Sequence, residues 1–165
     1  MTALLALKDT LLDSVKEVFE SMVFMSLSEV EGQAPDAGDL ALLGTITFTG
    51  SLEGCLTICC GQRCAQTIAA NMLCMESLDE LADEDTVDAI GEIANMVMGS
   101  VKTRLQDEIT DITISIPSVV QGRHLSNRLS EGMVQAVVNA TLADEHHASF
   151  SLLHRESGTG SGGNG

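Results

Sequence analysis

The spacing of apolar residues along the chain predicts three helices. Between Thr2 and Met25 apolar side chains recur every three or four positions, the period of a helix with one buried face. The same spacing predicts a shorter helix over Ala65–Cys74 and a second long helix over about Asp85–Leu105. Ser77 is placed to cap a short acidic turn between these two helices.

Other segments have the pattern of strands. Leu42–Phe48 and Gly54–Cys60 are rich in β-branched residues and flank the turn Thr49-Gly50-Ser51, which predicts a hairpin. Three more strands are expected over Ile112–Ile116 (ended by Pro117), Met133–Leu142 and Ala148–Leu153. Long helices that alternate with antiparallel hairpins predict an α+β fold, in which two long helices cover an antiparallel sheet.

The two long helices resemble each other in sequence. Residues 13–20 (DSVKEVFE) and 88–95 (DAIGEIAN) align without a gap at an offset of 88 − 13 = 75 residues, and each helix leads into a strand region. We interpret this match as an internal duplication of a helix-plus-hairpin unit. Chance agreement between two amphipathic helices is the competing interpretation.

Composition narrows the class of protein. The chain of 165 residues is long enough for one core, and we expect residues 1–155 to form a single domain and the Gly/Ser-rich tail 156–165 to be disordered. Eight basic and 24 acidic residues give a net charge of −16, and Trp and Tyr are absent, which argues against a nucleic-acid partner. The apolar run at the N-terminus is too short for a signal sequence or membrane span. We therefore expect a cytoplasmic protein without a membrane contact.

Four of the five cysteines are close together in sequence, which raises the question of a metal site. The spacing C-x3-C-C-x3-C lacks the C-x2-C pair of zinc sites, and Cys59 and Cys60 would point to opposite faces of a strand. We favour reduced, buried thiols and expect no metal site, with a metal as the minor alternative.

The second long helix carries a polar stripe on the side opposite its apolar face. Asp88, Glu92, Asn95 and Gly99 follow one another at i, i+4, i+7 and i+11, so they share one outward face of the helix. An ordinary solvated helix face could have this pattern. However, Asn and Gly are poor residues inside a helix, and Gly91 and Gly99 would leave room for another molecule to approach the stripe.

This stripe, followed by Pro117, resembles the signature of the CheC/CheX/FliY family of chemotaxis phosphatases. The segment from Gly91 to Gly99 is most similar to the CheX branch, and the order of helices and hairpins agrees over residues 5–154. Pro117 lies about one residue closer to the stripe than the family pattern has it. The resemblance implies a CheC-like fold of duplicated helix-plus-hairpin units.

The resemblance also implies an activity, the hydrolysis of the aspartyl phosphate on a CheY-like response regulator. Asn95 would orient the attacking water, and Glu92 would pair with a lysine of the regulator. Asp88, Gly91, Gly99 and Pro117 would contribute to docking. The protein would need no cofactor of its own, because the regulator supplies Mg²⁺.

The first repeat departs from this pattern. Glu20 stands where the motif has Asn, and its carboxylate would repel the phosphoryl group, so we expect one active site per chain. One site per chain again resembles CheX, which in its family works as a homodimer. Since the strand Met133–Leu142 has no Lys, Arg or Pro to protect an edge, we expect a homodimer. The alternative function is a non-catalytic CheC-like binding or scaffold module for a response regulator or flagellar component.

Overall fold

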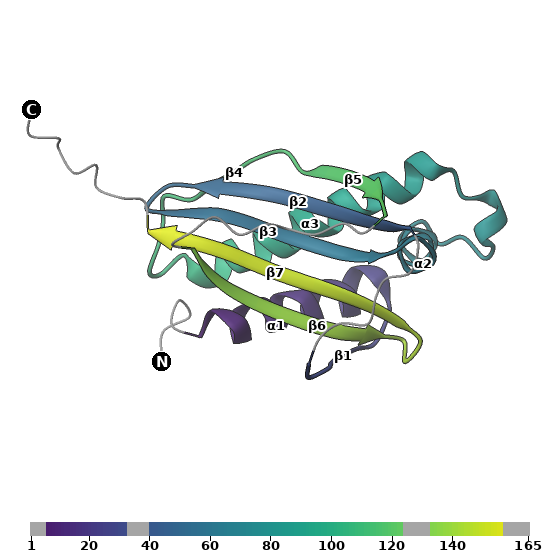
Figure 1. Cartoon of the computed structure of the whole chain (residues 1–165), viewed down its shortest axis with the longest axis horizontal. Coiled ribbons are helices and arrows are strands. Elements are labelled where there is room, and N and C mark those ends of the chain that lie inside the picture. The colour runs from purple at the N-terminus through teal and green to yellow at the C-terminus, as the bar shows by residue number, and fades with distance from the viewer. Residues whose placement is uncertain (1–5, 33–39, 124–132, 157–165) are drawn as a thin grey trace, which may run out of the picture.

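The computed structural model describes residues 6–32, 40–123 and 133–156. Figure 1 shows one antiparallel sheet, with the two long helices side by side behind it and a shorter helix at one end. In chain order the elements are α1 (Leu7–Val18), the π-helical segment η1 (Phe19–Val23), β1 (Leu27–Glu29), β2 (Ala41–Thr49), β3 (Leu52–Gly61), α2 (Gln62–Met72), η2 (Leu78–Glu80), α3 (Asp83–Leu105), β4 (Thr113–Ile114), β5 (Ser118–Gly122), β6 (Val134–Leu142) and β7 (His146–Glu156). The α+β fold is therefore confirmed.

The order of the strands reveals two similar units. The sheet runs β1-β6-β7-β3-β2-β4, and β5 pairs with β2 next to β4. A helix, a short strand and a hairpin thus occur twice, as α1-β1-β2-β3 and as α3-β5-β6-β7. The short strand of each unit pairs with the hairpin of the other unit, β1 with β6 and β5 with β2. This exchange agrees with the predicted duplication and was not predicted from the sequence.

The core fills the space between the sheet and the long helices. Every second residue of β2 from Leu42 to Phe48 is buried, as a strand with one covered face requires. The Phe19 and Phe150 rings meet edge to face, with centroids 5.7 Å apart. Gly44 lets α3 approach β2 closely, because a Cβ at this position would lie 2.9 Å from Cγ2 of Ile90 and 3.0 Å from Cγ2 of Ile58.

The predicted hairpins and the second long helix agree with the structure. The first helix differs, because its regular part ends at Val18 and continues as the π-helical segment η1. The expected strand over Ile112–Ile116 is reduced to the two residues of β4. Pro117, which was expected to end that strand, stands between β4 and β5, directly before β5 begins at Ser118.

The sequence did not predict the short strands β1 and β5. The expected disordered tail lies outside the described residues, apart from Glu156 at the end of β7.

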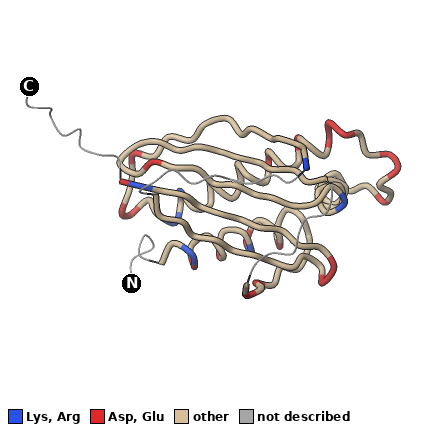
Figure 2. Tube along the Cα trace, viewed as in Figure 1, with Lys and Arg blue, Asp and Glu red and all other residues tan. Residues whose placement is uncertain are grey.

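Charged residues are distributed unevenly over the fold. Figure 2 shows acidic residues gathered at the start of α3 and in the turns, whereas the strands carry few charges. Asp83, Glu84 and Asp85 form the first turn of α3, where negative charge is favourable. The Ala82 N–H donates a hydrogen bond to Asp85 Oδ2 at 3.2 Å. Within the part of the chain that the structure describes, no helix is long and apolar enough to cross a membrane.

Candidate functional site

The stripe on α3 is the candidate site. The apolar face of α3 is buried over β2 and β3, and this packing turns Asp88, Glu92 and Asn95 outward, where all three side chains are exposed. Neither a hydrogen bond nor an ion pair joins any of these side chains to another described residue. The structure thus presents two carboxylates and one carboxamide along about 10 Å of helix, with no partner inside the described chain.

One side of the stripe is bounded by β5. Gly91 is buried there, and a Cβ added to it would lie 3.6 Å from Cγ2 of Val119 and 3.7 Å from Cγ of Pro117. These are ordinary contact distances, so the space beside Gly91 is filled by the protein's own side chains. Gly91 therefore brings Pro117 close to the stripe, which differs from the predicted clearance for another molecule; its role in docking stays a prediction.

Gly99, at the other end of the stripe, lies in open space. A Cβ added here would meet no atom within 4 Å. Nothing inside the described chain thus requires glycine at this position, which costs a helix about 1 kcal/mol relative to alanine. The openness is what the predicted docking role needs, although it does not test that role.

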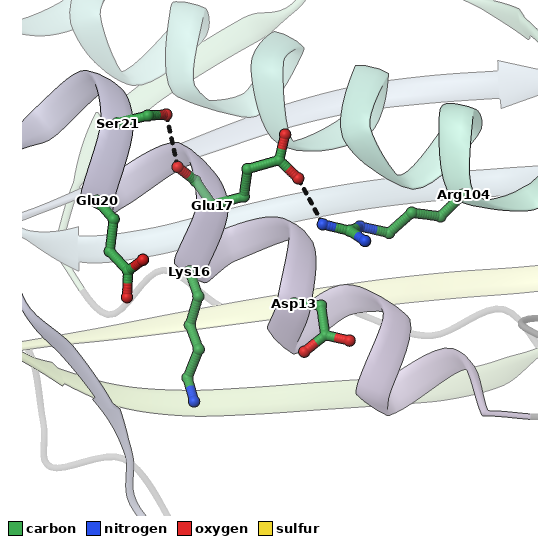
Figure 3. Close-up of a pocket in the computed structure, with 6 residues that line it drawn as sticks. All are labelled: Asp13, Lys16, Glu17, Glu20, Ser21 and Arg104. Atoms are coloured by element: carbon green, nitrogen blue, oxygen red, sulfur yellow. Dashed lines mark hydrogen bonds and ion pairs between the residues drawn. The ribbon is translucent and has the colours of Figure 1, made fainter.

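The matching stripe on α1 is arranged differently (Figure 3). Glu17, the counterpart of Glu92, points toward α3, where it accepts hydrogen bonds from the Arg104 guanidinium and, at 3.3 Å, from Ser100 Oγ. Glu20, the counterpart of Asn95, points away from α3 as Lys16 does. A hollow of about 580 Å³ is bordered by Lys16, Glu17, Glu20 and Arg104, among others. Arg104 of the same chain therefore pairs with Glu17, the carboxylate that would have to contact a partner protein.

A second hollow, here called the α1–α3 groove, lies where the C-terminal end of α1 passes α3. It has a volume of about 450 Å³ and adjoins the stripe, because Gly99 lines it. Sequence patterns did not indicate this groove, since its walls come from residues more than 70 positions apart.

Four of the cysteines lie in β3 and at the start of α2. Cys60 and Cys64 are buried, and a hydrogen bond with the Cys64 thiol, together with burial, raises the pKa of the Cys60 thiol well above its usual value. Burial also raises the pKa of Cys59. Among the described residues, no group of three or more His, Cys, Asp and Glu side chains is placed to hold a metal ion. Because their pKa values are raised, the thiols of Cys59 and Cys60 stay protonated at neutral pH.

Comparison with solved structures defines the fold class. A CheX from Vibrio vulnificus aligns at 22% identity with a TM-score of 0.74, over 89% of this chain and 95% of that chain. A CheC-like superfamily protein from a Shewanella species aligns at 24% identity with a TM-score of 0.73, over 89% and 96%. A third match, at 22% identity and a TM-score of 0.67 over 90% and 97%, is a CheX in complex with CheY, BeF3 and Mg²⁺ from Borrelia burgdorferi. The fold is that of the CheC-like chemotaxis proteins.

Sequence comparison identifies the family within this class. The model of a family described as "Chemotaxis phosphatase CheX" matches residues 42–141. The chain belongs to this family, as the stripe on α3 had indicated. No curated protein matches its sequence.

Proposed function

We propose that this protein hydrolyses the aspartyl phosphate of a CheY-like response regulator. The observation that carries the proposal is the exposed Glu92 and Asn95 pair, which has no partner among the described residues of a CheX-family chain. A protein substrate must bring its phosphoaspartate to the enzyme, and an outward helix face can receive it. The Borrelia burgdorferi CheX, which has the same fold, is in complex with CheY.

Asn95 is the residue assigned to the chemistry. Its carboxamide orients a water in line with the phosphorus, and it adds no negative charge beside a phosphoryl group that is already anionic. The water oxygen bonds to phosphorus as the bond to the aspartyl oxygen breaks, which yields inorganic phosphate and the free carboxylate. Alignment of the water supplies the rate, because an acyl phosphate is already activated.

Glu92 fixes how the regulator docks. It lies three residues before Asn95, so it is displaced along α3 by about 4.5 Å and points to the same side. There it pairs with a lysine of the regulator, while Asp88, Gly99 and Pro117 provide further contacts. The regulator brings Mg²⁺, which neutralises phosphoryl charge. A response-regulator partner also places the protein in the cytoplasm.

We further propose that the protein is a homodimer, with the free part of β6 at the interface. Part of the edge of this strand is covered within the chain, because β1 pairs with β6 from Ala140 to Leu142. Val30 N–H also donates to the Asn139 carbonyl at 2.8 Å. The first half of β6, from Val134 to Val138, has no second strand partner among the described residues. Sedimentation at micromolar concentration tests this proposal, and a monomeric mass would contradict it.

The alternative is a scaffold that binds the regulator without turnover, and phosphate release distinguishes the two functions. A phosphorylated CheY-like receiver domain is incubated with and without the protein, and its loss of phosphate is followed over time. The phosphatase proposal predicts faster release in proportion to protein concentration. Binding without any acceleration would support the scaffold instead.

A further inference from the structure

The α1–α3 groove is a hollow beside the polar stripe, with both apolar and polar side chains in its walls. Val18, Met22 and Met96 form its apolar part, whereas its polar part comes from the ion pair of Glu17 and Arg104 together with Ser21, Ser100 and Thr103. Val18 is buried, Met96 is half-buried, and the Met22 side chain is 48% exposed. Methionine side chains are flexible and polarisable, and they adapt readily to the shape of a partner. Two of them border this hollow in a protein whose surface is strongly acidic.

The groove and the stripe form one continuous surface. Gly99 belongs to both, and no atom would contact a Cβ at this position within 4 Å. Met96 directly follows Asn95 in α3, so it lies about 100° further around the helix, toward α1. A molecule that covers Asn95 and extends past Gly99 therefore enters the groove without meeting an intervening side chain at Gly99.

The stripe alone is too small to hold a protein. From Asp88 to Gly99 it measures 11 residues, or about 16 Å, along a helix about 10 Å wide. This is about 160 Å², whereas a stable protein interface takes about 800 Å² from each partner. The regulator must therefore also cover surface beside α3, and the groove offers a hollow there with the exposed side chain of Met22 and the half-buried side chain of Met96 in its walls.

We propose that the receiver domain that presents its phosphoaspartate to the stripe also inserts an apolar side chain into the α1–α3 groove. This inference rests on the proposed function and extends it, because it assigns Met22 and Met96 to recognition of the regulator. The stripe aligns the reacting group, and the groove holds the partner in place. Met22 is a docking residue and takes no part in the chemistry.

Binding of an unreactive, activated receiver tests the groove directly. The probe is a CheY-like receiver domain with BeF3 and Mg²⁺, titrated against the wild-type protein and against Met22→Ser and Met22→Leu. The matched control is Leu73→Ser, because Leu73 at the end of α2 is 50% exposed and does not line the groove. Thermal unfolding of each variant is measured to check that it folds.

We expect Met22→Ser to raise the dissociation constant about tenfold, the scale of removing one apolar side chain from an interface. Met22→Leu and Leu73→Ser should remain within about twofold of the wild type, since one keeps an apolar side chain and the other lies elsewhere. At saturating phosphorylated receiver, the turnover of Met22→Ser should equal that of the wild type.

Several results would overturn the groove assignment. Unchanged binding by Met22→Ser would do so, as would equal weakening by the two serine variants or a lower turnover with an unchanged dissociation constant. Asn95→Ala separates this proposal from the catalytic one, because it should bind the probe normally and fail to release phosphate. A wild-type protein that does not bind the activated receiver would overturn both proposals.

Discussion

The two long helices carry matching sequences, but only α3 leaves its polar stripe free. Glu92 is exposed and has no described partner, whereas its counterpart Glu17 contacts Arg104 and Ser100 across the helix pair. The carboxylate at this position of the repeat is therefore free on α3, whereas on α1 it joins the two helices through an ion pair. The difference follows from Arg104 on α3, because its guanidinium pairs with Glu17 on α1 and not with Glu92 on its own helix.

The helices also differ in geometry. α3 keeps α-helical geometry over 23 residues, whereas α1 keeps it over 12 and then changes to the π-helical segment η1. A π turn holds more residues per turn, so Glu20 is out of phase with the preceding residues. The segment closes at Phe24, which is 70% exposed and has a left-handed backbone with φ of 59°, where α3 has Gly99. The first stripe is therefore altered in charge, phase and access.

Replacement of the amide on α3 should have the largest effect on activity. Asn95→Ala is expected to lower the turnover of phosphorylated receiver about 100-fold, because the water loses its orienting group. Its melting temperature should stay close to that of the wild type, since the position is exposed. Gln106→Ala, which removes another exposed amide at the end of α3, is the control and should be fully active. A wild-type rate in Asn95→Ala would contradict the mechanism.

Charge reversal at Glu92 should rank second. Glu92→Lys places a cation against the lysine of the regulator, so we expect activity at subsaturating receiver to fall about 30-fold, mainly through weaker docking. The loss should shrink as salt concentration rises, because exposed charges are screened. Asp107→Lys, an equal charge change just beyond α3, tests for a general effect of net charge. An equal loss in that control would remove Glu92 from the docking model.

A bulky residue at Gly99 would give α3 the side chain that α1 has. Gly99→Phe should reduce activity about tenfold, because a ring would stand where the partner passes. The helix backbone should accept a side chain here, since a Cβ at this position meets no atom within 4 Å. Steady-state kinetics and thermal unfolding check the two halves of this prediction. Full activity would show that the region around Gly99 is not part of the docking surface.

Removal of the ion pair between α1 and α3 should lower the free energy of unfolding only slightly. Arg104→Ala eliminates the ion pair with Glu17, whose side chain is largely exposed, so we expect the free energy of unfolding to fall by about 0.5–1 kcal/mol. Urea unfolding at low and high salt measures this change. A decrease of several kcal/mol would mean that the pair determines the packing of α1 against α3.

The smallest effect is expected at Glu20. Glu20→Ala should leave phosphatase activity unchanged, and Glu20→Asn should not restore turnover in an Asn95→Ala background, because phase and access remain altered after the charge is removed. Single-turnover assays at high protein concentration are sensitive enough to detect weak rescue. A large loss in Glu20→Ala would show that the first repeat takes part in docking or catalysis.

Much of the fold follows from local patterns. The helical period and the hairpin at Thr49-Gly50-Ser51 determine elements through neighbours in the sequence, and the outward direction of Glu92 and Asn95 follows from the apolar face opposite them. The short strands β1 and β5 were missed, because three and five residues are too few for a clear alternation. Their partners are distant in the chain, so no local signal announces them.

Features that depend on packing could not be predicted in this way. The contact between Glu17 and Arg104 joins residues 87 positions apart, and it exists only because α1 and α3 lie side by side. The π-helical geometry of η1 leaves the sequence spacing unchanged, so the pattern of α1 appears regular to its end. The groove is likewise absent from any pattern along one helix.

The exchange of short strands between the two units also governs how the chain can fold. Leu27 of β1 pairs with Leu142 of β6, a separation of 142 − 27 = 115 residues, so this contact closes one of the largest loops available to the chain. Neither half can complete its own part of the sheet, and each half alone would leave a bare hairpin edge. A single ancestral unit of this design would find its missing strand only in a second copy of itself. Gene fusion would then have turned an obligate partner into the other half of one polypeptide.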